Sequence, residues 1–133
     1  MAETAAIAKM AQFVSDEIFS VFGWERKPHR DLNFECELKA HDKKTHPADV
    51  VYHYDSPLDP HRVYLNVDLK SYARNSISGS VVAGAANNMI LAMDCANRSS
   101  EWRGRYVGNE ENFDVHGLLF VYNHDAGFDS GWT

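Results

Sequence analysis

The segment at residues 63–70 constrains the fold more than any other part of the chain, because aliphatic and polar side chains alternate through it without exception. The odd positions hold the aliphatic residues and the even positions hold the others: Val63, Leu65, Val67 and Leu69 against Tyr64, Asn66, Asp68 and Lys70. A period of two is that of a β-strand, whose successive side chains point to opposite faces of a sheet. The segment therefore predicts a strand with one buried face.

Upstream of this strand, the sequence predicts one helix and two more strands. Residues 3–22 carry apolar side chains at helical spacing, which predicts an amphipathic helix that ends at Gly23 and buries Met10, Phe13, Val14, Ile18 and Val21. Residues 25–30 include Pro28 and predict a loop, whereas residues 32–38 and 49–54 predict strands. A dense turn signal at residues 55–60 then leads into the strand at residues 63–70.

Downstream, Ser76 or Ser78 is expected to cap a second helix that runs to about Arg98. A polar connection follows, and the apolar run at residues 117–122 predicts an interior strand. The expected class is α/β, in the order helix, three strands, helix, strand. The small residues of the second helix and the side of the third strand that carries Tyr64 and Asn66 are the expected surfaces for association.

Length and charge limit the function. The 133 residues suit one domain, expected to span residues 1–133 and to continue into a longer natural chain. Lys and Arg number 13 against 19 Asp and Glu, and the net charge of −6 excludes a protein that coats nucleic acid through a basic surface. Contact with nucleic acid would need a local patch, a bound cation or a partner.

The cysteines and the apolar segments indicate the compartment. Cys36 and Cys95 lie far apart without a C-x-x-C spacing, which argues against a disulfide framework and a zinc knuckle and favours reduced, buried thiols. The N-terminus has no signal-peptide pattern, and glycine and polar residues interrupt the apolar stretch at residues 77–96. We therefore expect a soluble cytoplasmic protein without a membrane span.

Two aspartates are expected to face each other. A hairpin centred between residues 58 and 59 pairs residues whose numbers sum to 117, which places Asp49 opposite Asp68. The β-carbons of directly opposed residues lie about 4.5–5.5 Å apart, and like charges at that range are destabilising unless a cation separates them. Magnesium takes oxygen ligands of this kind. Lys70 shares the face of Asp68 and would place a positive charge beside a phosphate group, and Glu17 is a third acid, on the expected buried face of the first helix.

Other interpretations of these residues remain open. The pattern acid-x-Lys occurs four times in the chain, so a solvated strand face with a surface ion pair is the alternative for Asp68 and Lys70. The spacing of His41, His46, His53 and His61 matches no zinc motif and favours loop histidines, although His46 and His53 can contact substrate near Asp49. Arg103 and Arg105 alternate with aromatic residues as in a segment that stacks on bases, with an ordinary surface connection as the alternative.

Together these residues resemble a known superfamily. Pro47-Ala48-Asp49, followed by Asp68-Leu69-Lys70 in this order of elements, resembles the PD-(D/E)xK nucleases over about residues 3–122. The resemblance implies a restriction-endonuclease-like αβββαβ core with a mixed sheet flanked by helices. It implies that Asp49, Asp68 and the backbone carbonyl of Leu69 bind Mg²⁺, with Mn²⁺ as a substitute, that Lys70 acts on the attacking water and the phosphate, and that Glu17 is the acid of the first helix.

The resemblance also suggests a biological setting. Phe22-Gly23-Trp24 and the segment at residues 119–125 are similar to nuclease-like subunits of bacterial anti-phage defence systems, which act with a second protein. We therefore expect a metal-dependent nuclease that acts on DNA and associates with a protein partner or with copies of itself. The alternatives are a catalytically idle nuclease fold that serves as a binding scaffold, and an unrelated α/β domain with an acidic hairpin.

Overall fold

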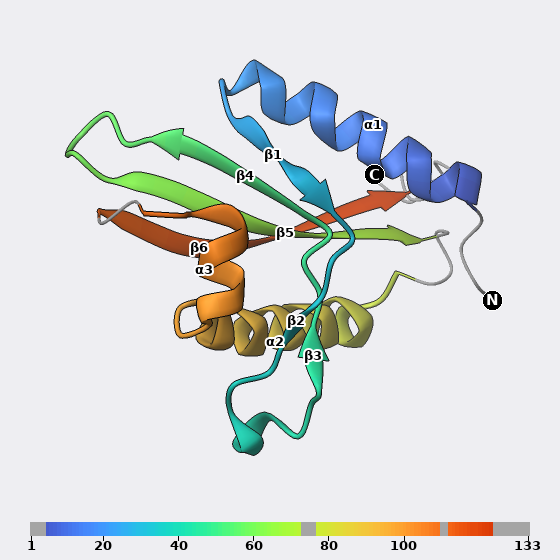
Figure 1. Cartoon of the computed structure of the whole chain (residues 1–133). Helices are drawn as coiled ribbons and strands as arrows, with labels where there is room; N and C mark the ends of the chain where they lie inside the picture. The colour runs from blue at the N-terminus through green and yellow to red at the C-terminus, as the bar shows by residue number, and fades with distance from the viewer. Residues whose placement is uncertain (1–4, 73–76, 110–111, 124–133) are drawn as a thin grey trace.

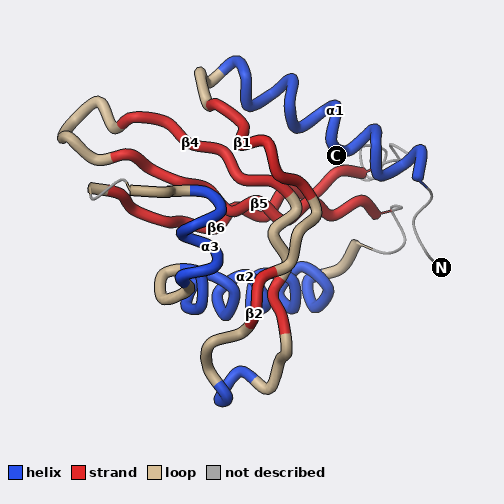
Figure 2. The backbone as a smooth tube through the Cα atoms, viewed as in Figure 1, coloured by secondary structure: helices blue, strands red, loops and turns tan. Residues whose placement is uncertain are grey.

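The computed structural model describes residues 5–72, 77–109 and 112–123, which form an α/β fold (Figures 1 and 2). In chain order the helices and strands are α1 (Ala5–Val21), β1 (Glu25–Arg30), β2 (Phe34–Glu35), the short 3-10 helix η1 (Lys39–His41), β3 (Thr45–His46), β4 (Val50–Asp55), β5 (Arg62–Tyr72), α2 (Gly79–Ala96), α3 (Ser100–Tyr106) and β6 (Phe113–Asn123). No helix within these ranges is long and apolar enough to cross a membrane.

The main sheet is mixed and has the strand order β1-β4-β5-β6. β4 is antiparallel to β1 and to β5, whereas β5 and β6 are parallel. Parallel neighbours need a crossover connection, and α2 and α3 lie in that connection. A mixed sheet flanked by helices is the arrangement that the family resemblance implied.

The register of the β4–β5 hairpin agrees with the prediction residue by residue. Val50 pairs with Val67, and the pairing continues without a slip to Asp55 opposite Arg62. The paired numbers sum to 117 throughout, so the turn chemistry at residues 55–60 sets the register as expected. Asp49, one residue before β4, is thereby brought to the level of Asp68.

Helices cover both faces of the sheet (Figure 1). On one face α1 packs over a cluster that includes Phe19, Val50 and Val67. On the other face α2, α3 and the β2–β3 hairpin enclose a second cluster that includes Val51, Tyr64 and Trp102. Successive residues of β5 therefore alternate between two buried surfaces.

This burial corrects the prediction that β5 has one exposed face. Tyr64 is 1% exposed and Asn66 is fully buried, so the side of β5 that was expected to serve association lies in the core. The polar character of Asn66 is satisfied internally, because its side-chain amide donates to the carbonyl of Pro47 at 3.4 Å and its Oδ1 accepts from Nε1 of Trp102 at 3.0 Å. Alternation in the sequence here reflects an internal hydrogen-bond network rather than contact with water.

Four of the predicted elements differ in the structure. The apolar run at residues 117–122, expected as an interior strand, belongs to β6, which lies at the edge of the main sheet. Residues 25–30, expected as a loop, form the edge strand β1, where Pro28 is tolerated within a register irregularity between Arg26 and Arg30. The strand expected at residues 32–38 is limited to β2, which pairs with β3 outside the main sheet. The polar connection after α2 contains the helix α3, capped by Ser99, whose side chain accepts from the N–H of Trp102.

The buried face of α1 is also different from the predicted one. The helix buries Ala11, Ser15 and Phe19, whereas Phe13 is 61% exposed and Val21 is 82% exposed. The ring of Phe19 packs between aromatic rings of the sheet, including Tyr52 and Phe120, and this contact sets the rotation of the helix. The small side chains at the two preceding turns let the helix approach the strands.

The start of α2 agrees with expectation. Ser78 is its N-cap, and its side chain accepts a hydrogen bond from the N–H of Val81 at 3.2 Å. The other candidate cap, Ser76, and the end of the 119–125 segment, residues 124–125, lie outside the described residues. The helix ends at Ala96, two residues before the predicted end.

Candidate metal-binding active site

Two carboxylates and a lysine meet at the open end of the β4–β5 hairpin. Asp49 Oδ2 accepts a hydrogen bond of 2.8 Å from the backbone N–H of Leu69, so the Asp49 side chain reaches across to β5. The neighbouring Asp68 is only 3% exposed, and its Oδ1 lies 3.3 Å from Nζ of Lys70. About a third of the Lys70 side chain is exposed to solvent, which leaves its ammonium group accessible beside the two acids.

The electrostatics of Asp49 reflect this crowding. Burial, together with the neighbouring carboxyl groups of Asp68 and Asp31, raises the pKa of Asp49 to about 7, against the opposing effect of the Leu69 N–H. An ionised Asp49 beside Asp68 is therefore unfavourable unless a cation compensates the two charges.

Asp31 is a third carboxylate near this pair, and it is not among the residues that the sequence indicates. It follows β1 directly, has the left-handed φ of 54°, and donates its backbone N–H to the carbonyl of Asp49 at 2.9 Å. Its side chain accepts from the amide of Gln12 on α1 at 3.4 Å. Because the pattern of residues 25–30 predicts a loop, no signal in the sequence connects Asp31 with the hairpin.

The donor atoms at this end of the hairpin fit a hard divalent cation. One carboxylate on β5 and one directly before β4 offer oxygen ligands of the kind that Mg²⁺ and Mn²⁺ take. The N–H and C=O groups of one strand residue point to the same side, and the Leu69 N–H points to Asp49. The Leu69 backbone therefore lies beside the Asp49 carboxylate.

Glu17 does not occupy the position expected from the sequence. It lies on an exposed part of α1, so the expectation that it faces the sheet is wrong. The acid of α1 that faces the sheet is Asp16, which pairs with Arg26 and Arg30 and accepts from the hydroxyl of Tyr52. In addition, α1 covers the face of Val50 and Val67, opposite to the face that Asp68 shares with Tyr64 and Asn66.

Two histidines were expected to contact nucleic acid near Asp49. His46 is fully buried beside Phe34, which is incompatible with such a contact in this conformation. His53 is largely buried on β4, with its Nε2 3.5 Å from a carboxylate oxygen of Glu25, and burial lowers its pKa. Neither position supports the expected role.

Arg103 and Arg105 were also expected to contact nucleic acid. Arg105 pairs with Glu101 at 3.2 Å and donates to the carbonyl of Asn33 at 3.1 Å, so it fastens α3 to the segment before β2. The guanidinium of Arg103 lies 4.9 Å from the ring centre of Phe113, which pairs with the first residue of β5. Six residues of strand separate that level from Asp68, a distance of about 20 Å.

The fold and the carboxylate–lysine constellation define a domain of the PD-(D/E)xK nuclease superfamily, as the resemblance implied. More specifically, the model of the GAPS4 protein PD-(D/E)XK nuclease domain matches residues 1–131. The chain belongs to this family of anti-phage defence nuclease domains. No curated protein and no solved structure shows a significant match to it. Members of the superfamily typically use divalent metals.

Proposed function

We propose that this domain is a magnesium-dependent nuclease that hydrolyses phosphodiester bonds of DNA in anti-phage defence. The observation that carries the proposal is the pairing of Asp49 with Asp68 at the end of the hairpin, with the ammonium group of Lys70 3.3 Å from Asp68. The family match supports a nuclease-type role in defence.

Each residue has a distinct task in this proposal. Asp49, Asp68 and the Leu69 carbonyl would hold Mg²⁺ or Mn²⁺, and the ion would supply activation of water and neutralisation of charge on the phosphate. Lys70 is held by Asp68 beside the scissile phosphate, where its N–H groups orient the attacking water and donate to a phosphate oxygen as negative charge develops. Glu17 is left out because it is exposed on α1, which covers the other face of the sheet.

The substrate and partners are part of the same proposal. A net charge of −6 disfavours binding of free DNA, so we propose that a protein partner, or further copies of the chain, supplies the basic surface that holds DNA. We also propose a cytoplasmic location, where phage DNA is encountered.

The alternative is a catalytically idle scaffold, and the acidic net charge is the observation that favours it. Metal binding separates the two functions without requiring the partner. We expect electron paramagnetic resonance to show that Mn²⁺ binds the wild-type protein and does not bind Asp49→Asn or Asp68→Asn. Glu17→Gln is the matched control, because it removes an exposed acid of the same chain and should bind Mn²⁺ normally.

A cleavage assay then tests the chemistry. Linear and circular DNA should be cut by wild-type protein with Mg²⁺, in the presence of its partner where one is required, and not by Asp68→Asn. A protein that binds no Mn²⁺ would support the scaffold. Cleavage by Asp49→Asn and Asp68→Asn at the wild-type rate would place the active site elsewhere.

A further inference from the structure

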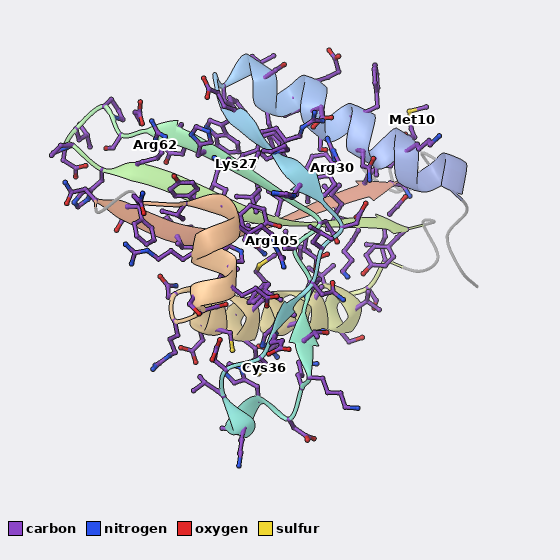
Figure 3. All side chains as sticks on the ribbon, in the orientation of Figure 1. Met10, Lys27, Arg30, Cys36, Arg62 and Arg105 are labelled. Atoms are coloured by element: carbon purple, nitrogen blue, oxygen red, sulfur yellow. The ribbon has the colours of Figure 1, made fainter. Side chains whose placement is uncertain are left out.

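Four side chains with the donor atoms of a zinc site converge on the α2 side of the sheet, and none of them belongs to the carboxylate pair. Cys36 follows β2, His41 ends η1, His46 belongs to β3, and Cys95 lies in the last turn of α2. One sulfur or ring nitrogen from each residue lies within 4.8 Å of all the others. Figure 3 shows Cys36 in the hairpin that projects past α2.

The spacing of three of these donor atoms, those of Cys36, His41 and Cys95, matches the edges of a tetrahedral metal site. Cys36 Sγ and Cys95 Sγ are 3.6 Å apart, and Nδ1 of His41 lies 3.6 Å from the first sulfur and 3.3 Å from the second. A zinc ion with bonds of about 2.3 Å to sulfur and about 2.0–2.1 Å to nitrogen requires edges of about 3.8 Å between sulfurs and about 3.5–3.6 Å between sulfur and nitrogen. A disulfide would instead need the sulfurs about 2.05 Å apart.

The unsatisfied ring nitrogens of His46 are independent evidence that this residue binds a metal ion. Its side chain is fully buried, and neither ring nitrogen has a hydrogen-bond partner among the described residues. A buried polar group without a partner costs free energy, so such groups in folded proteins normally have a reason. Coordination of a metal by one ring nitrogen of His46 supplies that reason.

The surroundings of the four residues also suit a metal. His41 Nε2 lies 3.2 Å from Oδ2 of Asp94, and this contact orients the ring with Nδ1 toward the two sulfurs. A carboxylate on the second nitrogen of a ligating histidine is a usual feature of zinc sites. The backbone N–H of Glu37 donates to Cys95 Sγ at 3.4 Å, a contact that favours a thiolate.

We propose that Cys36, His41, His46 and Cys95 bind a structural zinc ion. Both thiols lose a proton on binding, including the Cys36 proton that is otherwise donated to the carbonyl of Leu38 at 3.2 Å. Two thiolates, two neutral imidazoles and Zn²⁺ sum to zero charge, which is acceptable in a buried position. Four protein ligands fill the tetrahedron, so the ion holds structure and does not catalyse.

The ion would fasten the β2–β3 hairpin to the end of α2. It would also fix His46, which is followed by Pro47, Ala48 and Asp49, and so would hold the start of the chain segment that carries the proposed magnesium ligand Asp49. The inference does not depend on the proposed nuclease activity, because its ligands and its metal differ from those at the carboxylate pair.

The metal content of purified protein tests the proposal. We expect about one zinc per chain by mass spectrometry after expression in zinc-containing medium, and loss of zinc in Cys36→Ser and His46→Ala. His61→Ala removes a histidine outside the cluster and should retain zinc. Asp49→Asn and Asp68→Asn should also retain it, which separates this site from the proposed magnesium site.

Spectroscopy on wild-type protein keeps the test independent of whether the variants fold. X-ray absorption should show two sulfur ligands at about 2.3 Å and two nitrogen ligands at about 2.0–2.1 Å. Cobalt replacing zinc should give sulfur-to-cobalt charge-transfer absorption. The proposal would be overturned by folded wild-type protein that holds no stoichiometric zinc and shows no cobalt charge-transfer band. It would also be overturned by an X-ray absorption spectrum in which zinc has only oxygen and nitrogen ligands, or by full zinc retention in Cys36→Ser.

Discussion

Replacing Asp49 by asparagine should stabilise the metal-free protein while removing its capacity to bind magnesium. Asparagine has the same shape as aspartate. Its Oδ1 can accept the hydrogen bond that the N–H of Leu69 donates to the Asp49 carboxylate at 2.8 Å in the wild-type protein. Its NH₂ group can donate to the carboxylate of Asp68, whereas in the wild-type protein the carboxyl group of Asp49 faces that carboxylate. The substitution therefore removes a repulsion and a buried charge without opening a cavity.

The magnitude follows from the pKa of Asp49, which burial and the neighbouring acids raise to about 7 from an ordinary value of about 3.9. A difference of about three pKa units corresponds to about 4 kcal/mol. Partial exposure of the carboxyl group screens this charge and reduces the effect to about 2 kcal/mol.

The sign depends on pH. Below about pH 4 the carboxyl is protonated in the folded and unfolded chain alike, and its ionisation costs the folded state nothing. Between about pH 4 and 7 the unfolded chain loses the proton while the folded one retains it, so wild-type stability falls as the pH rises. Asp49→Asn should therefore exceed wild type by about 2 kcal/mol at pH 8 and by less than about 1 kcal/mol at pH 5.

Urea unfolding of both proteins from pH 5 to pH 8, in buffer without added magnesium or manganese, measures this difference. Glu17→Gln is the control, because Glu17 is exposed and its replacement should leave the pH dependence unchanged. Added Mg²⁺ should raise the unfolding free energy of wild type and not of Asp49→Asn. An asparagine variant that is less stable than wild type at pH 8, or equally favoured at both pH values, would refute the reasoning.

Three further substitutions test the site and its support. Lys70→Gln should slow DNA cleavage by about 100- to 1,000-fold and leave Mn²⁺ binding intact, and loss of Mn²⁺ would instead make Lys70 necessary for the metal. Trp102→Phe deprives the buried Asn66 Oδ1 of its hydrogen-bond donor and should lower the free energy of unfolding, measured with urea, by about 1–3 kcal/mol. Unchanged stability would mean that another group donates to Asn66. Gly117→Ala places a β-carbon 2.6 Å from Cγ and Sδ of Met89 and should cost about 1–3 kcal/mol in thermal unfolding, and an unaltered melting temperature would show that α2 yields easily.

The parts of the fold that the sequence predicted well are those governed by local pattern. The β4–β5 register follows from two strand patterns and one turn, and these patterns alone are enough to place Asp49 beside Asp68. The cap of α2 at Ser78 is likewise a local hydrogen bond. Such features need only neighbours in the chain, and a single sequence contains them.

The parts that failed depend on contacts between distant segments. The rotation of α1 is set by the packing of Phe19 against the sheet, and helical spacing alone allowed a face that included Glu17. The burial of Asn66 depends on Trp102, from a helix that the pattern did not predict. Alternation showed that β5 is a strand but could not show what covers each face.

The cysteine and histidine cluster is a stronger case of the same limit. Three of its members lie within residues 36–46, at spacings that match no zinc motif, and the fourth is Cys95, in the last turn of a helix beyond two strands of the sheet. Counting spacings therefore led away from a metal site. Only the approach of the β2–β3 hairpin to α2 brings the four donor atoms within 4.8 Å of one another.

The short segment from His46 to Asp49 connects the two proposed metal sites, and three of its four residues make contacts that hold it in place. His46 belongs to the zinc cluster, the carbonyl of Pro47 accepts from Asn66, and the carbonyl of Asp49 accepts from the N–H of Asp31. These contacts fix a carboxyl group whose ionisation is unfavourable in the metal-free protein. Because the position of Asp49 is already set by its neighbours, little of the free energy of magnesium binding is needed to order its carboxyl group. The zinc cluster should therefore affect catalysis only by keeping Asp49 in this position.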